Sequence, residues 1–229
     1  PKGSQPRRRM EGNPPRNDSH PGEQVDEMSP IYCGPPSLRE RCKQLCEKCD
    51  KIISTHLNPE PADLPPMELR VDEVKWRVSS NQGAARQQTG VKNTEVRRQV
   101  DKMLPLGVIK PSQAEHYSQV HLTPKPHTPQ EWRFCIDYRW LNLACQGMGW
   151  PIPNIKNMLQ RLGEKRAKYY AKLDLTSGYH QAPLHQNSRG YTAFVTFMGL
   201  YEWCRVPMGL KGAPSYFQGV LASIVLVGL

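Results

Sequence analysis

The 229-residue sequence contains no hydrophobic run long enough to cross a membrane and no N-terminal signal peptide. The apolar run Val220–Leu229 has ten residues, against the ~20 that a membrane-spanning helix needs. Seven cysteines form an odd number without a secretory context, which predicts reduced thiols rather than a disulfide framework. Internal repeats are also absent. These absences predict an intracellular protein with no membrane partner.

Acidic residues are scarce in the C-terminal part of the chain. From Trp132 onward, eleven basic residues face four acidic ones, and Asp174 is the only aspartate after Asp137. The formal net charge of the whole chain is +10. A basic surface neutralises phosphates and releases counterions, so nucleic acid is a natural partner. A soluble basic domain without a ligand has the same composition and stays an alternative.

The first 36 residues have little that a folded core requires. They hold eight prolines, many charges and one aromatic residue, Tyr32. Such a stretch cannot bury enough apolar surface to offset the entropy lost on ordering. We predict a disordered tail over residues 1–36, in which Arg7–Arg9 either contacts RNA, serves as a targeting signal or is a solvated charge run.

A helix is predicted over Ser37–Leu57, followed by a Pro-rich linker at Asn58–Pro66. Charged residues separate apolar ones that recur at a spacing of three or four: Leu38, Cys42, Leu45, Cys49 and Ile52.

The cysteines of this helix permit a second interpretation. Cys42, Cys46 and Cys49, with Cys33 or His56 as a fourth ligand, would supply the donors of a zinc site. The same spacing places the three cysteines on one helix face, where cysteine packs as a small hydrophobe. Structural zinc sites usually take paired ligands from separate elements, which favours the packing interpretation.

Helices and strands alternate irregularly after residue 71, which predicts the α+β class. The expected helices are Thr94–Leu106, Ile155–Leu162 and Ala213–Val227. The expected strands are 108–112, 117–125, Arg133–Tyr138, Tyr169–Leu175, Tyr191–Phe197 and Glu202–Val206, with Val71–Val91 irregular.

The segment Tyr169–Gln181, YYAKLDLTSGYHQ, carries the strongest chemical signal. An apolar run that resembles a strand delivers Asp174 and then breaks at Thr176–Gly178, and Tyr179 follows. A lone carboxylate at a strand end, in a basic stretch, suits the holding of a cation against phosphates. The alternative is an aspartate that accepts hydrogen bonds within a turn.

Two further segments, RFCIDYRWLN (Arg133–Asn142) and RVPMGLKGAPSYFQ (Arg205–Gln218), flank this one. Together with TAF and YEW between them, the series resembles the reverse transcriptases of Ty3/gypsy-type long-terminal-repeat retrotransposons, from about Val71 to Leu229. The resemblance implies the fingers and part of the palm of a right-hand polymerase, with helices packed on an antiparallel sheet. The implied organisation is a tail at 1–36, a helix with a linker at 37–70, and fingers and palm at 71–229.

The resemblance implies RNA-directed DNA polymerisation from deoxynucleoside triphosphates with Mg²⁺ or Mn²⁺. Two divalent ions about 3.5–4 Å apart would clamp the attacking and leaving oxygens. Asp174 would be the catalytic carboxylate and a metal ligand, with the carbonyl of Leu175 as a further ligand.

The remaining roles are also implied by the resemblance. Nucleotide contacts would come from Lys125, Arg133, Met208 and Gly209, and from Tyr179 as the ring that excludes a 2′-hydroxyl. Template and primer contacts would come from Asp137, Arg139, Lys211 and Gln218.

Three of these roles have plainer alternatives. Tyr179 would equally serve as an ordinary packed ring, and Asp137 with Arg139 as an ion pair. The loop Thr123–Pro129 departs from the family's Lys-rich run and is longer, which puts the role of Lys125 in doubt.

The family's second metal-binding motif, Tyr-x-Asp-Asp, does not occur in this sequence. We therefore expect a piece of a longer Pol polyprotein, with no polymerase activity by itself. Protease, RNase H and integrase would be its neighbours, in the cytoplasm or in virus-like particles, with the DNA product destined for the nucleus. The rivals are a decayed remnant that binds nucleic acid at most, a zinc-binding adaptor, and an RNA-dependent RNA polymerase palm, against which Tyr179 argues.

Overall fold

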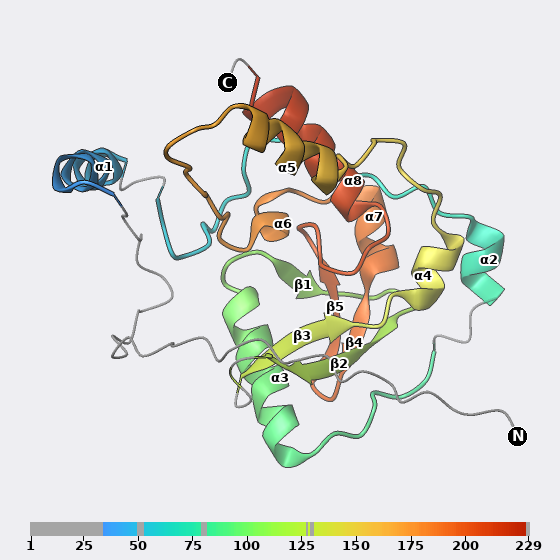
Figure 1. Cartoon of the computed structure of the whole chain (residues 1–229). Coiled ribbons are helices and arrows are strands. Elements are labelled where there is room, and N and C mark those ends of the chain that lie inside the picture. The colour runs from blue at the N-terminus through green and yellow to red at the C-terminus, as the bar shows by residue number, and fades with distance from the viewer. Residues whose placement is uncertain (1–33, 50–52, 79–81, 127, 129–130, 228–229) are drawn as a thin grey trace, which may run out of the picture. The chain divides into compact units, whose positions relative to one another are not determined.

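The structure is a computed structural model of the chain and describes residues 34–49, 53–78, 82–126, 128 and 131–227 (Figure 1). Residues 1–33 of the predicted tail lie outside these ranges, and Cys33 is one of them. The chain divides into two compact units, Pro1–Lys48 and Cys49–Leu229.

The first unit contains helix α1, Pro36–Lys48, which is shorter than predicted. The prediction extended this helix to Leu57, but residues 53–57 are not helical. No residue of α1 is buried, and Leu45 is 62% exposed. Helices draw most of their stability from packing of an apolar face, so two further turns without such packing would gain little.

The second unit is built on a five-stranded sheet with the order β1-β5-β4-β2-β3. Its strands are β1 (Ile109–Pro111), β2 (Ser118–Pro124), β3 (Trp132–Ile136), β4 (Phe194–Thr196) and β5 (Gly199–Trp203). Three of the pairs are antiparallel as predicted, but β2 and β4 run parallel, with Ser118 opposite Phe194. The sheet is therefore mixed.

The hairpin of β4 and β5 turns earlier than predicted. Residues 190–192 form a 3₁₀ turn rather than the start of a strand, and β5 begins at Gly199 rather than Glu202. Gly199 adopts φ +143, and the amide of Met198 donates to the hydroxyl of Thr196. Because glycine tolerates this backbone conformation, the chain reverses at Phe197–Met198.

Helix α3 (Gly90–Met103) lies against β3 (Figure 1). It begins one turn before the predicted start, with Thr89 rather than Thr94 at its N-cap, and the hydroxyl of Thr94 donates to the carbonyl of Gly90. The other helices of this unit are α2 (Glu73–Val78), α4 (Arg139–Ala144), α5 (Ile155–Glu164), α6 (Gly178–Gln181), α7 (Gln186–Arg189) and α8 (Ala213–Val220), which continues as a π-helix over Leu221–Val225.

The core forms between α3, the sheet and α8. It includes Val96, Val100, Leu122, Phe194, Trp203, Val206 and Tyr216, all buried. Full burial of one such side chain contributes roughly 1.5–3 kcal/mol. The buried hydroxyl of Tyr138 donates to the carbonyl of Thr192 over 2.9 Å, which joins the start of α4 to the 3₁₀ turn before β4.

The Pro-rich stretch at 58–66 has no helix or strand, yet it is bonded along its length to the C-terminal half. The amide of Ala62 donates to the carbonyl of Gln181 over 2.8 Å. Met67 and Leu184 form a parallel bridge, and the hydroxyl of Tyr216 donates to the carbonyl of Pro65. The stretch is thus part of the second unit.

The predicted strand at Tyr169–Leu175 is wrong. These residues form no strand, and every one of them is exposed. Leu173 is 91% exposed. Within the described part of the chain no strand runs beside this run, and an extended segment gains strand hydrogen bonds only from a neighbour.

Candidate polymerase site

Asp174 lies in the exposed segment just described, not at the end of a central strand as predicted. Its side chain forms no hydrogen bond or ion pair with the residues that the structure describes. The turn interpretation, in which the carboxylate accepts hydrogen bonds, is therefore not what the structure shows. Asp174 is a solvent-facing carboxylate free to meet a ligand.

The donors around Asp174 suit one end of a cation site. A carboxylate is a hard oxygen ligand, and Mg²⁺ in phosphate-transfer sites often takes one or two carboxylates plus substrate oxygens. The carbonyl of Leu175 accepts the amide of Gly178 over 3.1 Å and keeps a second lone pair. Among the described residues no three His, Cys, Asp or Glu side chains gather as metal ligands, around Asp174 or on α1.

The turn after Asp174 is shaped by three small residues. Ser177 adopts a left-handed conformation with φ 48, and the amide side chain of Gln181 donates to the carbonyl of Thr176 over 2.8 Å. A Cβ atom added at Gly178 would lie 3.3 Å from the Cζ atom of Phe217. The lack of a side chain at Gly178 thus lets the turn approach α8.

Tyr179 packs edge-on against Phe217, with ring centroids 5.2 Å apart. Its side chain is half-buried, so one part of the ring contacts the core and the other part is accessible. The contact agrees with the packing interpretation and also holds the ring in one place. A fixed, partly accessible ring is what a steric filter requires.

His180, next to Tyr179, points into the core. Its ring stacks on Trp203 with centroids 5.0 Å apart, and its Nδ1 lies 3.1 Å from the carbonyl oxygen of Val206. A carbonyl can only accept, so Nδ1 carries the proton. Burial lowers the pKa of His180.

Arg205 was not predicted as a site residue, yet it is 1% exposed and lies behind the same turn. Its guanidinium donates to four backbone carbonyls, of Asn58, Pro59, Leu106 and His180. Burial lowers its pKa. The sequence signal was present, since an arginine within the otherwise uncharged run WCRVPMGL is unusual.

Asn142, on α4, was also missed as a site residue. Its Nδ2 donates to the carbonyl of Gly209 over 2.9 Å, and its Oδ1 accepts the amide of Lys211 over 2.8 Å. Gly209 has φ +93, a conformation that favours glycine. One amide side chain therefore sets the path of the loop that exposes Met208, which is 59% exposed. The side chain of Gln218 lies half-buried on α8.

Asp137 and Arg139 form the ion pair expected from the plainer interpretation. Two nitrogens of Arg139 lie 2.8 and 2.7 Å from the carboxylate oxygens, and Arg86 lies 3.2 Å away. The hydrogen bonds from Arg139 lower the pKa of Asp137 to about 2. The side chain of Arg139 remains 82% exposed, so this paired guanidinium faces solvent.

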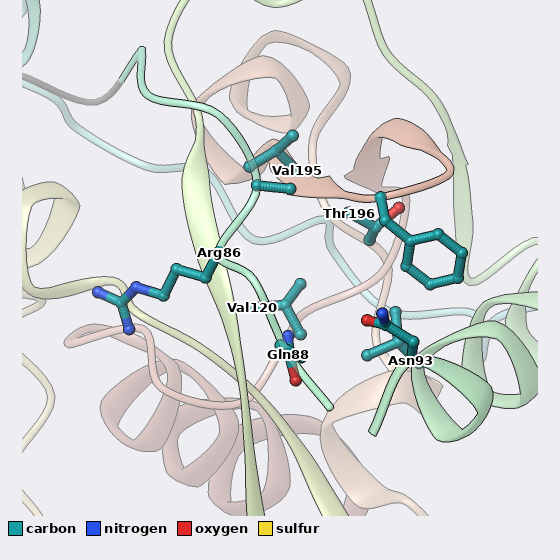
Figure 2. A pocket seen from close by; sticks show the side chains of 9 residues that line it. Arg86, Gln88, Asn93, Val120, Val195 and Thr196 are labelled. Atoms are coloured by element: carbon teal, nitrogen blue, oxygen red, sulfur yellow. The ribbon is translucent and has the colours of Figure 1, made fainter. Parts of the chain in front are cut away.

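Arg86 belongs to a stretch that lies along β2. Gln119 accepts the amide of Arg86 and donates to the carbonyls of Gly83 and Ala84. Figure 2 shows the cavity beneath, where Val120 and Val195 point inward and the Arg86 side chain extends away. At about 10 Å³ this cavity holds no more than one water, so it is not a ligand site.

Lys125 and Arg133 lie on the hairpin of β2 and β3. Lys125 pairs with Glu131 across the loop, and its amide donates to the Glu131 carbonyl over 2.9 Å. Arg133 is exposed on β3, opposite Thr123. Trp132 is covered by the ammonium of Lys92, 5.1 Å from the ring centroid. Within the described residues, no hydrogen bond or ion pair joins either cation to the Asp174 segment.

Comparison with known proteins bears on the family and the fold of the chain. Residues 123–226 match the family model described as reverse transcriptase (RNA-dependent DNA polymerase). The Pol polyprotein of the Drosophila melanogaster transposon opus is 40% identical over 134 residues, covering 57% of this chain and 13% of that protein. The transposon 412 polyprotein of the same fly is 32% identical over 192 residues, covering 82% and 15%. The chain thus spans a small part of these relatives.

Solved structures of low identity share the fold. The prototype foamy virus protease–reverse transcriptase superposes with a TM-score of 0.64 at 23% identity, over 82% of this chain and 24% of that one. A foamy viral protease–reverse transcriptase in complex with an RNA/DNA hybrid gives 0.62 at 18% identity, over 81% and 25%. The predicted fingers-and-palm fold is therefore confirmed.

None of the helices in the described residues is long and apolar enough to cross a membrane. Four observations point to the same family: the series of motifs, the family model over 123–226, the transposon relatives and the fold. The chain therefore belongs to the reverse transcriptases of gypsy-type retrotransposon Pol polyproteins.

Proposed function

We propose that this chain is the part of an RNA-directed DNA polymerase that receives the deoxynucleotide and one end of the template. The observation that carries the proposal is the setting of Tyr179, fixed on Phe217 directly after the turn that follows Asp174. A rigid ring at that place would leave no room for a 2′-hydroxyl.

The nucleotide contacts come from two loops. Arg133 and Lys125 on the hairpin are exposed cations, and a guanidinium suits phosphate oxygens. Met208 and Gly209 lie on the loop that Asn142 holds, where an exposed apolar side chain and bare backbone can approach a base.

The template contacts come from four polar residues, Asp137, Arg139, Lys211 and Gln218. Asp137 orients Arg139 without consuming all its donors, since a guanidinium has five. Lys211 is exposed, and Gln218 is half-buried on α8. Phosphate contacts of this kind position a nucleic acid without reading its sequence.

Asp174 would supply one carboxylate to a divalent cation, with the Leu175 carbonyl beside it. The cation, Mg²⁺ or Mn²⁺, would neutralise charge on the triphosphate. One carboxylate is too few for a two-ion site, and the described residues hold no group of three His, Cys, Asp or Glu side chains that could bind a metal ion. Activity then depends on a further carboxylate motif from the longer polyprotein, and this chain by itself does not polymerise.

The rest of the polyprotein is the proposed setting. Protease, RNase H and integrase segments would accompany this one in the cytoplasm or in virus-like particles. The proposed limits are a tail at 1–36, a helix with its linker at 37–70, and fingers and palm at 71–229.

The test is primer extension on an RNA template with deoxynucleotides and Mg²⁺. The 229-residue chain should give no product, while a longer Pol protein that adds the Tyr-x-Asp-Asp segment should extend the primer. Asp174→Asn in the longer protein should abolish extension by orders of magnitude. Unimpaired extension by that variant would refute the role of Asp174.

A second candidate is a remnant that binds nucleic acid without catalysis, which the single carboxylate favours. It predicts that the longer protein binds template and primer but never extends them. Extension by the longer protein removes this candidate.

A further inference from the structure

The buried guanidinium of Arg205 joins three stretches that are distant in the sequence. Its Nη1 donates to Asn58 over 2.9 Å and to His180 over 3.1 Å. Its Nη2 donates to Leu106 over 3.0 Å and to Pro59. All four acceptors are backbone carbonyls. The side chain of Arg205 therefore joins the N-terminal stretch, the residues just after α3 and the Ser177–Gln181 turn.

We call this set of contacts around Arg205 the joint, and further hydrogen bonds extend it along the N-terminal stretch. The hydroxyl of Thr176 donates to the carbonyl of Ser54 over 2.7 Å, and Ala62 donates to Gln181 over 2.8 Å. Met67 then exchanges bonds with Pro183 and His185. The turn that carries Tyr179 is thus bonded on its outer side by residues 54–67, which precede the region matched by the family model.

A buried cation without a carboxylate is costly unless its donors are satisfied. In Arg205 both terminal nitrogens are paired, and only Nε has no partner in the described structure. A shorter or neutral side chain would leave several carbonyls unpaired at once. The joint is therefore specific to arginine.

We propose that Arg205 is a positioning residue, which fixes the Ser177–Gln181 turn, and with it Tyr179, through the carbonyls of Asn58, Pro59, Leu106 and His180. The inference rests on the function proposed above, in which Tyr179 lies beside the sugar of the incoming nucleotide. It assigns the segment 54–67 to the nucleotide site.

The first test uses the 229-residue chain and amide hydrogen exchange. Arg205→Lys keeps the charge but cannot reach four carbonyls, so exchange at Ala62 and His180 should become roughly ten-fold faster. Arg189→Met is the control, because Arg189 is half-buried where Arg205 is buried, and it donates to only one carbonyl, that of Leu184 over 3.2 Å. The amides of β2 and β3 should not change in either variant.

Unchanged exchange at Ala62 and His180 in folded Arg205→Lys would overturn the inference. Arg205→Met is the stronger variant and should give a larger effect. If it does not fold, the lysine variant still decides the question.

The second test measures sugar selectivity in the longer polymerase. The ratio of kcat/KM for a deoxynucleotide to that for the matching ribonucleotide should fall roughly five-fold in Arg205→Lys and stay constant in Arg189→Met. A loss of stability alone would lower both rates together and leave the ratio unchanged, which would contradict a positioning role. If the wild-type polymerase extends no primer, the proposed function fails, and the exchange experiment alone decides the role of Arg205.

Discussion

The side chain of Asn142 determines the path of the loop that contains Gly209. It donates to Gly209 and accepts from Lys211, so it satisfies a carbonyl and an amide that would otherwise need water. Because no other described side chain bonds to these two groups, the exposed Met208 depends on Asn142 for its place.

Replacing Asn142 by Ala should lower the free energy of unfolding by about 1–3 kcal/mol, since both bonds are lost. Chemical denaturation measures this. Asn157→Ala is the control, because Asn157 is exposed on α5 and should change stability by less than about 0.5 kcal/mol. Equal effects of the two substitutions would contradict the role of Asn142.

Asp137 makes the free energy of unfolding depend on pH. Hydrogen bonds from Arg139 lower the pKa of Asp137 to about 2, below its ordinary value of 3.8. A lowered pKa stabilises the fold above the unfolded value, and the gain is lost as the pH falls from about 4 to 2. Because the partner arginines are exposed, the contribution is about 1 kcal/mol or less.

Unfolding free energies of the wild type and of Asp137→Asn should therefore differ at pH 5 and converge at pH 2. Arg139→Met should reduce the difference at pH 5, since it removes the main cause of the lowered pKa. A constant difference across this range would show that the pair does not govern the acid response.

The sequence pointed to some of the candidate site residues and not to others. Tyr179 and Gly209 were proposed from the resemblance to the reverse transcriptases, and glycine and small residues mark the bends that precede or contain them. Arg205 and Asn142 bond chiefly to backbone groups, and backbone acceptors leave no mark in the side-chain sequence. Their partners come into reach only in the folded chain.

On the hairpin of β2 and β3, the residue proposed to bind the phosphates of the nucleotide is itself held in an ion pair. Lys125 pairs with Glu131, and the loop between them closes through backbone bonds. A triphosphate that binds Lys125 must compete with Glu131. In the longer polymerase, Glu131→Gln should lower the KM for deoxynucleotides up to about five-fold, as expected for an exposed pair worth at most 1 kcal/mol.

Lys125→Ala should raise the KM, and Glu131→Gln should have no further effect in that background. A steady-state double-mutant comparison measures this coupling. If Glu131→Gln lowers the KM equally with Lys125→Ala present, Lys125 is not the ligand.

Elements whose signal lies within their own residues were predicted correctly, whereas one predicted strand that would need a neighbouring strand does not form. Helix α3 and strands β2 and β3 follow from hydrophobic periodicity, which each carries itself. The run Tyr169–Leu175 has a strand-like composition but no paired strand among the described residues. Composition marks the capacity to pair, not the presence of a partner.

The exposed run makes a proteolysis prediction. Brief trypsin treatment of the chain should cleave after Lys172 well before it cleaves after Arg205, because cleavage requires an accessible backbone. Mass spectrometry of early products tests the order. Protection of Lys172 equal to that of Arg205 would contradict the exposed segment.

At the scale of the whole molecule, charge dominates the expected interactions. The chain has a formal charge of +10 and a C-terminal part with few acids. We expect binding to an RNA/DNA duplex that weakens with salt, with a slope of about −0.9 per phosphate contact in a plot of log K against log salt. Fluorescence anisotropy between 50 and 200 mM salt is the measurement, and affinity that does not change with salt would contradict an electrostatic interface.

The acceptors of Arg205 are all main-chain oxygens. The exposed side chains at positions 58 and 59 can therefore differ between relatives while the contacts to Arg205 persist, because every residue type carries that oxygen. At these positions, selection would act on the path of the backbone rather than on the residue type.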